Sequence, residues 1–263
     1  MKESLEYYNQ FDKKLINDYV LGNKRIINAI ENLGSFIPEN SNNILDIGSG
    51  LGWSSHEFAK AFPNSQVLAV DLSPVLINTA SKLFDTQENL TFKSYDLTQG
   101  LPVDMYDAIV MIDVYEHIPI ADRAKFHKSI KSVLAKNGRF ILACPSKYHQ
   151  DHLKNNNPTG LQPVDEDVDF GTIQMIAKQI SGEVIYFEYQ NIWNNYDYLY
   201  AVIELNPLYG NNVNGLKHQP IDIEQRKERA DRVNSKLGIK VEQVKRKKKT
   251  TTLKSLLKRV KKK

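Results

Sequence analysis

The sequence predicts an α/β protein with a doubly wound, mostly parallel sheet. Short apolar runs of strand length alternate along the chain with amphipathic stretches of helical period. The run 106–112 is almost entirely apolar, which is typical of a strand buried on both faces of a parallel sheet. A glycine-rich turn at residues 48–52 joins an apolar run to an amphipathic stretch, and a strand, turn and helix in this order can bring a ligand to bare backbone at a helix N-terminus.

The composition is that of an ordinary water-soluble protein. The chain has 263 residues, of which 41% are hydrophobic and 25% charged, so it can bury the core of one α/β domain with appendages. A single cysteine, Cys144, excludes an internal disulfide and a cysteine-based zinc site. Residues 1–7 are polar and no apolar run reaches the length of a membrane span, so we expect a cytoplasmic protein without a signal peptide.

The charge is distributed unevenly. The whole chain carries +4, but residues 245–263 hold eleven Lys or Arg and no acid, so the other 244 residues carry −7. An acidic body argues against a nucleic-acid-binding face on the folded domain. In the tail, four apolar residues fall at i, i+3, i+4 and i+7, which predicts a basic amphipathic helix that binds an anionic membrane surface: Leu253, Leu256, Leu257 and Val260. A nucleic-acid tail and a solvated end are the alternatives.

The turn after the first strand begins with an acid, Asp46, and continues through Gly48, Gly50 and Gly52. This spacing differs from the Gly-x-Gly-x-x-Gly of dinucleotide-binding proteins, and Asp46 would repel a pyrophosphate but attract an ammonium group. On these residues the sequence resembles the class I S-adenosylmethionine-dependent methyltransferases. The resemblance covers residues 44–205 and implies a seven-strand sheet whose last strand is antiparallel. It also implies S-adenosylmethionine as cofactor, with these four residues among its contacts.

Further cofactor contacts are predicted at the ends of later strands. Asp71 ends the second strand, 66–71, where an acid accepts hydrogen bonds from ribose hydroxyls, and Ser73 already provides the cap of the following helix. The apolar Leu72 could pack under the adenine. The resemblance implies that Asp96 receives the adenine amino group and that the amide of Leu97 meets a ring nitrogen. Ile112, at the end of the fourth strand, completes this predicted set.

An acidic motif follows the fourth strand, at the sheet edge where ligands bind in such folds. Its residues Asp113, Glu116 and His117 resemble the Glu-x-x-Glu-His of ubiquinone-pathway O-methyltransferases and small-RNA 2′-O-methyltransferases, with Asp in place of the first Glu. The resemblance implies that the three hold a divalent metal such as Mg²⁺, which polarises the hydroxyl to be methylated. Metal-free relatives also have Glu-His-x-Pro here, and in them the two residues only organise the loop.

The polar segment 145–171 is long for a connection in a compact domain, and we expect it to cover the methyl acceptor. His149 and His152 lie early in it, so that either of them, or His117, is a candidate general base. A surface loop with two solvated histidines is the alternative. Trp193, Tyr196 and Tyr198 are candidate acceptor contacts, although sheet packing would explain them equally well.

Four regions are predicted along the chain. Residues 1–36 are predicted to hold helices over 5–19 and 24–33. The resemblance implies that they form a lid in which Arg25 meets the cofactor carboxylate and which is lined by Tyr7, Tyr8, Phe11 and Tyr19, although ordinary helix packing would explain these aromatic residues equally well. Residues 37–206 form the S-adenosylmethionine-binding methyltransferase domain. Residues 207–244 are a linker and a charged helix of the kind that forms a short coiled-coil-like arm, and 245–263 are the basic tail.

These features together predict an S-adenosylmethionine-dependent methyltransferase. No Asn-Pro-Pro-Tyr or Asp-Pro-Pro-Tyr motif follows the fourth strand, which together with the acidic body disfavours nucleic-acid bases as acceptors. The amphipathic tail suggests an acceptor made at the inner membrane face, such as a sugar or glycan intermediate of surface polysaccharide biosynthesis that is methylated on oxygen. A quinone, a lipid or another small molecule is the alternative acceptor, and a non-catalytic nucleotide-binding scaffold is the alternative of another class. A homo-oligomer is left open.

Overall fold

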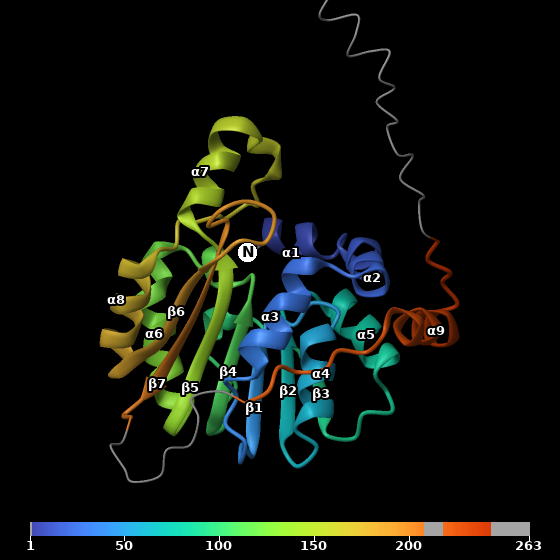
Figure 1. Cartoon of the computed structure of the whole chain (residues 1–263), viewed down its shortest axis with the longest axis horizontal. Helices are drawn as coiled ribbons and strands as arrows, with labels where there is room; N and C mark the ends of the chain where they lie inside the picture. Colours follow the sequence, from blue (N-terminus) through green and yellow to red (C-terminus); the bar gives the residue numbers. More distant parts are fainter. Residues whose placement is uncertain (1, 208–217, 243–263) are drawn as a thin grey trace, which may run out of the picture.

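The computed structural model describes residues 2–207 and 218–242 and contains, within them, one seven-strand sheet in the order β3-β2-β1-β4-β5-β7-β6 (Figure 1). Neighbours among β1 to β5 are parallel, whereas β7 runs antiparallel to both β5 and β6. The predicted fold class is therefore confirmed. The strands are β1 (Asn43–Ile47), β2 (Gln66–Asp71), β3 (Leu90–Ser94), β4 (Tyr106–Ile112), β5 (Leu134–Pro145), β6 (Gly182–Gln190) and β7 (Tyr198–Leu205).

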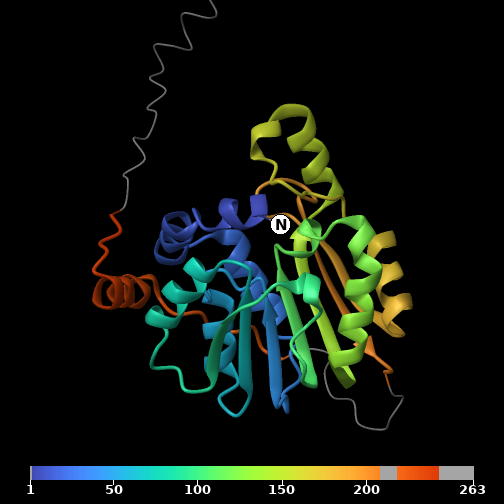
Figure 2. The same ribbon diagram turned by 180° about the vertical axis from the view of Figure 1, so that it is seen from behind.

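Helices cover both faces of the sheet, as the alternation of strands and helices predicts. On one face α3 (Lys24–Gly34) and α4 (Trp53–Ala61) share a core with Val110 and Ile112 of β4. On the other face α6 (Ile120–Val133) and α8 (Phe170–Ile180) pack on Ile109 and Met111 of the same strand (Figure 2). Successive side chains of a strand point to opposite faces, which explains why β4 is apolar along its length.

Three helices lie over the carboxyl ends of the parallel strands: α1 (Lys2–Tyr8), α2 (Asp12–Leu21) and α7 (Lys147–Asn156) (Figure 1). The single helix predicted over 5–19 is thus two helices, and at the break the Asn9 Oδ1 accepts a hydrogen bond from Ser73 Oγ at 2.6 Å. The segment 145–171 is only partly a loop. Ser146 caps α7 by accepting from the amide of His149, and the short helices η1 (Leu97–Gln99), η2 (Tyr115–His117) and η3 (Pro158–Gly160) complete the irregular connections.

The segment 218–242 packs on the body. Helix α5 (Pro74–Leu83) and α2 both contact α9 (Arg226–Leu237), whose Val233 is fully buried. The structure has a helix in the predicted charged segment, but α9 packs on the body and does not form a separate coiled-coil-like arm. Its two buried positions are four residues apart and form a stripe that faces the protein. The predicted tail 245–263 lies outside the described residues. None of the described helices has the length and apolar character needed to cross a bilayer.

Candidate active site

A cavity of about 290 Å³ lies between the carboxyl edge of the sheet and the overlying helices α1, α2 and α7. Its floor comes from the turn after β1 and from the end of β4, and its walls come from the helices and from the loop that follows η3. The predicted site residues that line it are Arg25, Gly48, Gly50, Asp71, Ile112, Asp113, Glu116, His117 and His149. Residues from distant parts of the sequence therefore meet where the resemblance places the cofactor and acceptor.

The glycine turn needs glycine for two different reasons. Gly48 and Gly50 line the cavity with φ values of 68° and 54°, a left-handed conformation that glycine adopts without strain and that leaves no side chain between their backbone and a ligand. Gly52 also has a positive φ, of 81°, but it does not line the cavity, and a Cβ there would lie 2.4 Å from the Phe92 ring. The predicted cofactor role therefore fits the first two glycines, while Gly52 allows close packing of α4 against β3.

Asp71 is held rigidly at the end of β2. Its Oδ2 accepts a hydrogen bond from the amide of Gly50 at 2.9 Å and its Oδ1 accepts one from the amide of Ser73 at 2.8 Å. Burial raises the pKa of this carboxyl group. Each carboxylate oxygen can accept a further hydrogen bond, so Asp71 remains suited to the predicted contact with ribose hydroxyls.

Asp46 is nearly inaccessible and does not line the cavity. Its Oδ2 accepts hydrogen bonds from the hydroxyls of Ser54 and Ser55, each at 2.6 Å, so the carboxylate fastens the first turn of α4 to β1. Burial raises its pKa to about 6. The sequence predicts contact with an ammonium group, whereas the structure gives Asp46 a structural role beneath the turn.

The residues predicted around the adenine are not brought to the cavity. Leu72, Asp96 and Leu97 are all absent from its lining. The Oδ1 of Asp96 instead accepts hydrogen bonds from the amide of Thr98 at 2.9 Å and from its hydroxyl at 2.8 Å, which caps η1. The resemblance implies adenine contacts for Asp96 and Leu97. In the structure Asp96 is the cap of η1, and neither residue lines the cavity.

Arg25 lies in the cavity wall but already has partners. Its Nε forms an ion pair with Asp113 Oδ2 at 2.9 Å, and its Nη1 donates a hydrogen bond to the Tyr198 hydroxyl at 2.8 Å. Asp113 has a φ of 58°, which is uncommon for a residue with a side chain and turns its carboxylate off the end of β4. The expected partner of Arg25, a cofactor carboxylate, would have to share it with Asp113.

Glu116 and His117 lie side by side in η2. Burial, and next the charge of Asp113, raise the pKa of Glu116 well above its ordinary value, and its Oε2 has no hydrogen-bond partner among the described residues. The His117 Nδ1 lies 2.7 Å from the carbonyl oxygen of Val164, so Nδ1 carries the proton and the lone pair is on Nε2, which lies 3.6 Å from Glu116 Oε1. Burial lowers the pKa of His117, which keeps the ring neutral at pH 7.

The geometry does not fit the predicted metal. Among the residues that the structure describes, no group of three or more His, Cys, Asp or Glu side chains is arranged to hold a metal ion. Asp113 is turned to Arg25, and the Nδ1 of His117 is taken by a backbone carbonyl. Asp113, Glu116 and His117 therefore resemble the alternative, in which Glu116 and His117 organise the loop.

The two histidines of α7 have different surroundings. His149 lines the cavity, and burial lowers its pKa. His152 is exposed, lies off the cavity and has its Nδ1 3.3 Å from the side-chain amide of Asn156, so the structure does not bring this candidate general base to the cavity. The helical twist explains this difference, because the face of α7 that meets the cavity is that of His149 and Leu153.

Two polar residues of the cavity, and one contact across it, are not predicted from the sequence. Ser49 and Trp53 flank the glycines, and their Oγ and Nε1 atoms are buried without a hydrogen-bond partner among the described residues. Tyr8 of α1 donates to Gln162 Oε1 at 3.0 Å, so α1 and the loop after η3 are joined above the cavity. The position of the glycine motif is the signal that points to the first pair, but nothing in the sequence pairs Tyr8 with Gln162.

Comparison with known proteins agrees with this geometry. Residues 44–138 match a family described as "Methyltransferase domain". The malonyl-[acyl-carrier protein] O-methyltransferase 1 of Ilyobacter polytropus is 31% identical over 101 residues, which are 38% of this chain and 37% of that protein. The Halalkalibacterium halodurans malonyl-[acyl-carrier protein] O-methyltransferase is 30% identical over 117 residues, 41% of this chain and 42% of its own. The matches thus span about two-fifths of these relatives.

The fold is shared more widely than the sequence. Magnesium protoporphyrin IX methyltransferase from Synechocystis PCC 6803, solved with bound SAH (S-adenosylhomocysteine), superposes with a TM-score of 0.61 at 17% identity, over 76% of this chain and 97% of that one. A TehB-like SAM-dependent methyltransferase from Corynebacterium glutamicum gives 0.57 at 19% identity, over 75% and 97%. Residues 44–138 thus match a methyltransferase domain family, and the chain shares its fold with S-adenosylmethionine-dependent methyltransferases.

Proposed function

We propose that this protein transfers a methyl group from S-adenosylmethionine to a hydroxyl oxygen of a sugar or glycan intermediate. The observation that carries the proposal is the single cavity wall that joins the glycine turn and Asp71 to a neutral, buried imidazole at His117. One end of the cavity is suited to a nucleoside and the other to removing a proton. A non-catalytic scaffold would have no need of the second end.

The residues at the glycine turn fit the cofactor. The buried Ser49 hydroxyl and the Trp53 indole N–H have no hydrogen-bond partner among the described residues, and such groups cost free energy until a polar ligand satisfies them. The backbone of Gly48 and Gly50 lines the cavity beside them without side chains in the way, and Asp71 would accept from the ribose. When bound, S-adenosylmethionine supplies an electrophilic methyl group on a sulfonium.

The chain's own part in the reaction is to align the acceptor and to remove its proton. His117 Nε2 would take the proton of the acceptor hydroxyl, because the carbonyl of Val164 fixes the other ring proton on Nδ1. The hydrogen bond from Tyr8 to Gln162 closes the cavity above the reacting groups and limits the entry of water. No enzyme nucleophile is required, because a direct displacement moves the methyl group.

The charges of the acceptor end favour a neutral hydroxyl over a carboxylate. Glu116 and Asp165 both line it, and its one arginine, Arg25, is already paired with Asp113. A carboxylate such as the malonyl group in the names of the relatives would meet these acids. Trp193 also lines the cavity and is 55% exposed, and an aromatic face with acidic and amide groups around it suits a sugar ring.

The location at an inner membrane face rests on the charge of residues 245–263, which lie outside the described residues. Eleven basic residues without an acid, together with a leucine stripe, favour an anionic surface, where each Lys or Arg contributes about 1 kcal/mol. A lipid-linked glycan would be presented there. Quinone and lipid acceptors share that location and are the second choice.

Calorimetric titration with S-adenosylhomocysteine tests the cofactor, and Asp71→Ala should weaken its binding at least tenfold. Release of S-adenosylhomocysteine should then be measured with sugar nucleotides, lipid-linked glycans and quinol precursors in parallel. Sugar-containing acceptors should give turnover, which His117→Gln should lower at least a hundredfold, whereas His152→Gln should not. Turnover with quinol precursors alone would contradict the sugar assignment, and absence of any cofactor binding would contradict the whole proposal.

A further inference from the structure

We propose that the C-terminal segment 218–242, here called the clamp, holds the cofactor cavity in its closed shape, with Arg229 as the positioning residue. The clamp lies outside the part of the chain that matches the methyltransferase domain family. The inference concerns the regulation of the proposed cofactor site and rests on the proposed function for the identity of the ligand. The contacts of the clamp with the rest of the protein do not depend on the identity of that ligand.

The clamp is attached to the body along its first half. The amide of His218 donates to the Ser35 carbonyl at 2.9 Å, and the amide of Ile221 donates to the Glu31 carbonyl at 3.3 Å. Further on, the amide of Glu224 donates to Glu57 Oε1 at 3.1 Å. These bonds run from the end of α3 to α4, so the clamp reaches α9 already fixed in register with the helix that follows the glycine turn.

Arg229 lies behind two residues of the cavity wall, Tyr19 and Trp53. Its Nε donates to the Tyr19 carbonyl at 2.6 Å, which caps the last turn of α2, and its Nη1 donates to the Glu224 carbonyl. The guanidinium carbon lies 4.9 Å from the ring centroid of Trp53 and 5.9 Å from that of Tyr19. One side chain, itself only 5% exposed, thus touches both α2 and the first residue of α4.

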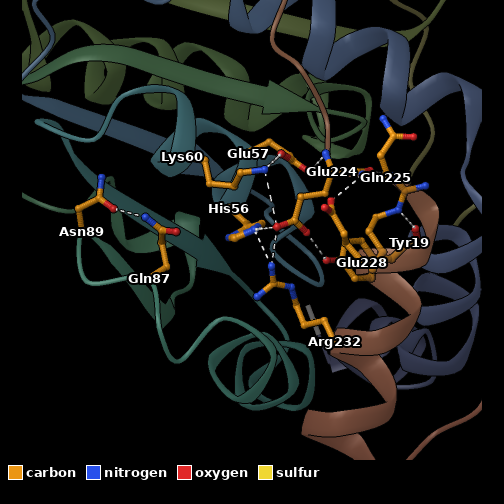
Figure 3. Close-up of polar contacts among 11 residues, drawn as sticks. Tyr19, His56, Glu57, Lys60, Gln87, Asn89, Glu224, Gln225, Glu228 and Arg232 are labelled. Atoms are coloured by element: carbon orange, nitrogen blue, oxygen red, sulfur yellow. Dashed lines mark hydrogen bonds and ion pairs between the residues drawn. The ribbon is translucent and has the colours of Figure 1, made fainter.

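Glu224 completes the attachment with a second set of bonds (Figure 3). Its Oε1 pairs with His56 Nε2 at 3.0 Å, with Lys60 Nζ at 3.6 Å and with Arg232 Nη2, and its Oε2 accepts from the Tyr19 hydroxyl at 3.3 Å. Burial alone would raise the pKa of Glu224, but the hydrogen bond from His56 and the neighbouring positive charges lower it to about 2. The carboxylate therefore stays ionised at any pH at which the protein works.

These contacts make the clamp a determinant of cofactor affinity. Tyr19 and Trp53 pack edge to face with ring centroids 5.4 Å apart, and both form the wall next to the glycine turn. Without Arg229 the Tyr19 and Glu224 carbonyls lose their donors, and the Trp53 ring loses the group packed behind it. A lysine could keep the charge but not both hydrogen bonds and the stacked plane. The free protein would then have to order α2 when the cofactor binds, which lowers affinity.

The test is calorimetric titration of the full chain with S-adenosylhomocysteine. Arg229→Ala should weaken binding at least tenfold, and Lys236→Ala should stay within twofold of the wild type. Lys236 is the matched control because it lies on the same helix and pairs with exposed Asp85 of the α5 end. Where the acceptor is known, the KM for the cofactor should rise with little change in kcat, a split that general loss of folded protein would not produce.

If Arg229→Ala folds poorly, tryptophan fluorescence of a milder variant, Arg229→Lys, provides a second measurement of cofactor affinity. The chain has two tryptophans, so Trp193→Phe leaves Trp53 as the only tryptophan, which can be excited selectively over the tyrosines. In that background S-adenosylhomocysteine should change the emission of Trp53, and Arg229→Lys should reduce the affinity read from this change at least threefold. A folded Arg229 variant with wild-type affinity overturns the clamp. Wild-type protein that does not bind S-adenosylhomocysteine overturns the proposed function instead.

Discussion

Two buried carboxyl groups near the cavity differ in their hydrogen-bond partners. Asp46 accepts two hydroxyl hydrogen bonds beneath the glycine turn, while Glu116 faces the cavity with one oxygen that has no partner in the described part of the chain. Burial raises the pKa of both. Ionising the buried Asp46 therefore lowers the stability of the fold, although its two hydrogen bonds offset part of this cost. The unpaired oxygen of Glu116 can instead bind a ligand in the cavity.

Asp46→Asn should stabilise the protein at pH 8. Because the folded-state pKa of Asp46, about 6, lies above its unfolded value, the group's contribution to stability is present at low pH and is lost as the pH rises towards 6. An asparagine oxygen can still accept from Ser54 and Ser55 without a charge. The free energy of unfolding should rise by about 1–3 kcal/mol at pH 8.

Urea unfolding monitored at several pH values measures this difference. The advantage of Asp46→Asn should shrink below pH 6 and disappear near pH 4. Asp46→Ala, which leaves both serine hydroxyls without an acceptor, should be destabilised by about 2 kcal/mol near pH 4. This deficit should shrink as the pH rises, because the variant also lacks the buried carboxylate. An asparagine variant less stable than the wild type at pH 8 would contradict this account.

His117 predicts a pH profile of its own. Burial lowers its pKa, so the imidazole stays neutral, and able to accept a proton, to a pH below the 6.5 of a free histidine. The acid limb of kcat should accordingly fall below pH 6.5. Rate measurements between pH 4.5 and 9 check this, and a limb above pH 7 would assign the base to another group.

At the scale of an element, the loop 191–197 shows how a connection is made rigid without regular structure. Asp197 is 2% exposed, and its carboxylate accepts from the amides of Ile192, Trp193 and Asn194 at 2.8, 2.9 and 3.0 Å. Tyr196 has a φ of 58°, which bends the chain back into β7. The result is a fixed turn that holds Trp193 at the cavity.

Asp197→Ala should therefore raise the KM for the acceptor about tenfold or more and leave S-adenosylhomocysteine affinity within twofold. The three amides lose their common acceptor, so Trp193 is no longer held for stacking on a ring. Steady-state kinetics and calorimetry separate the two effects. Asp167→Ala, which removes an exposed acid paired with Lys154, is the control, and equal KM values for the two variants would argue against a role of the loop.

For the whole molecule, the cavity is a product of three regions that are far apart in the sequence. The central domain supplies the floor, α1 to α3 and α7 supply the cover, and the clamp fastens α2 from outside. The described contacts of the C-terminal segment end before residue 243. Catalysis and the predicted membrane attachment should therefore be separable by shortening the chain.

A protein that ends after residue 242 should keep its melting temperature and its S-adenosylhomocysteine affinity, because no described contact is lost. It should no longer sediment with anionic liposomes, since the basic residues and the leucine stripe are removed. Neutral liposomes provide the control for the full-length protein. Equal sedimentation of both proteins with anionic liposomes would place the membrane contact elsewhere.

The fold and half of the site follow from local patterns. The apolar runs, the alternation with helices and the glycine turn determined the sheet, because burial on both faces requires apolar strands and a backbone turn with positive φ requires glycine. Asp71 follows in the same way, since strand ends of a parallel sheet meet at one edge. What these patterns could not give is which polar atoms are already satisfied, as Asp46 and Asp96 show by binding their own neighbours.

The contacts between residues far apart in the chain become visible only in the folded protein. Arg25 with Asp113, Tyr8 with Gln162 and the α9 contacts join residues 88 to 210 positions apart, and no local periodicity encodes such partners. The face of α7 that turns inward, and with it the choice of His149 over His152, depends on how that helix docks. The sequence by itself thus determined the strands and the ligand turn, through burial and backbone sterics. The lid, the clamp and the state of each buried charge depend on long-range packing, which sets where water is excluded.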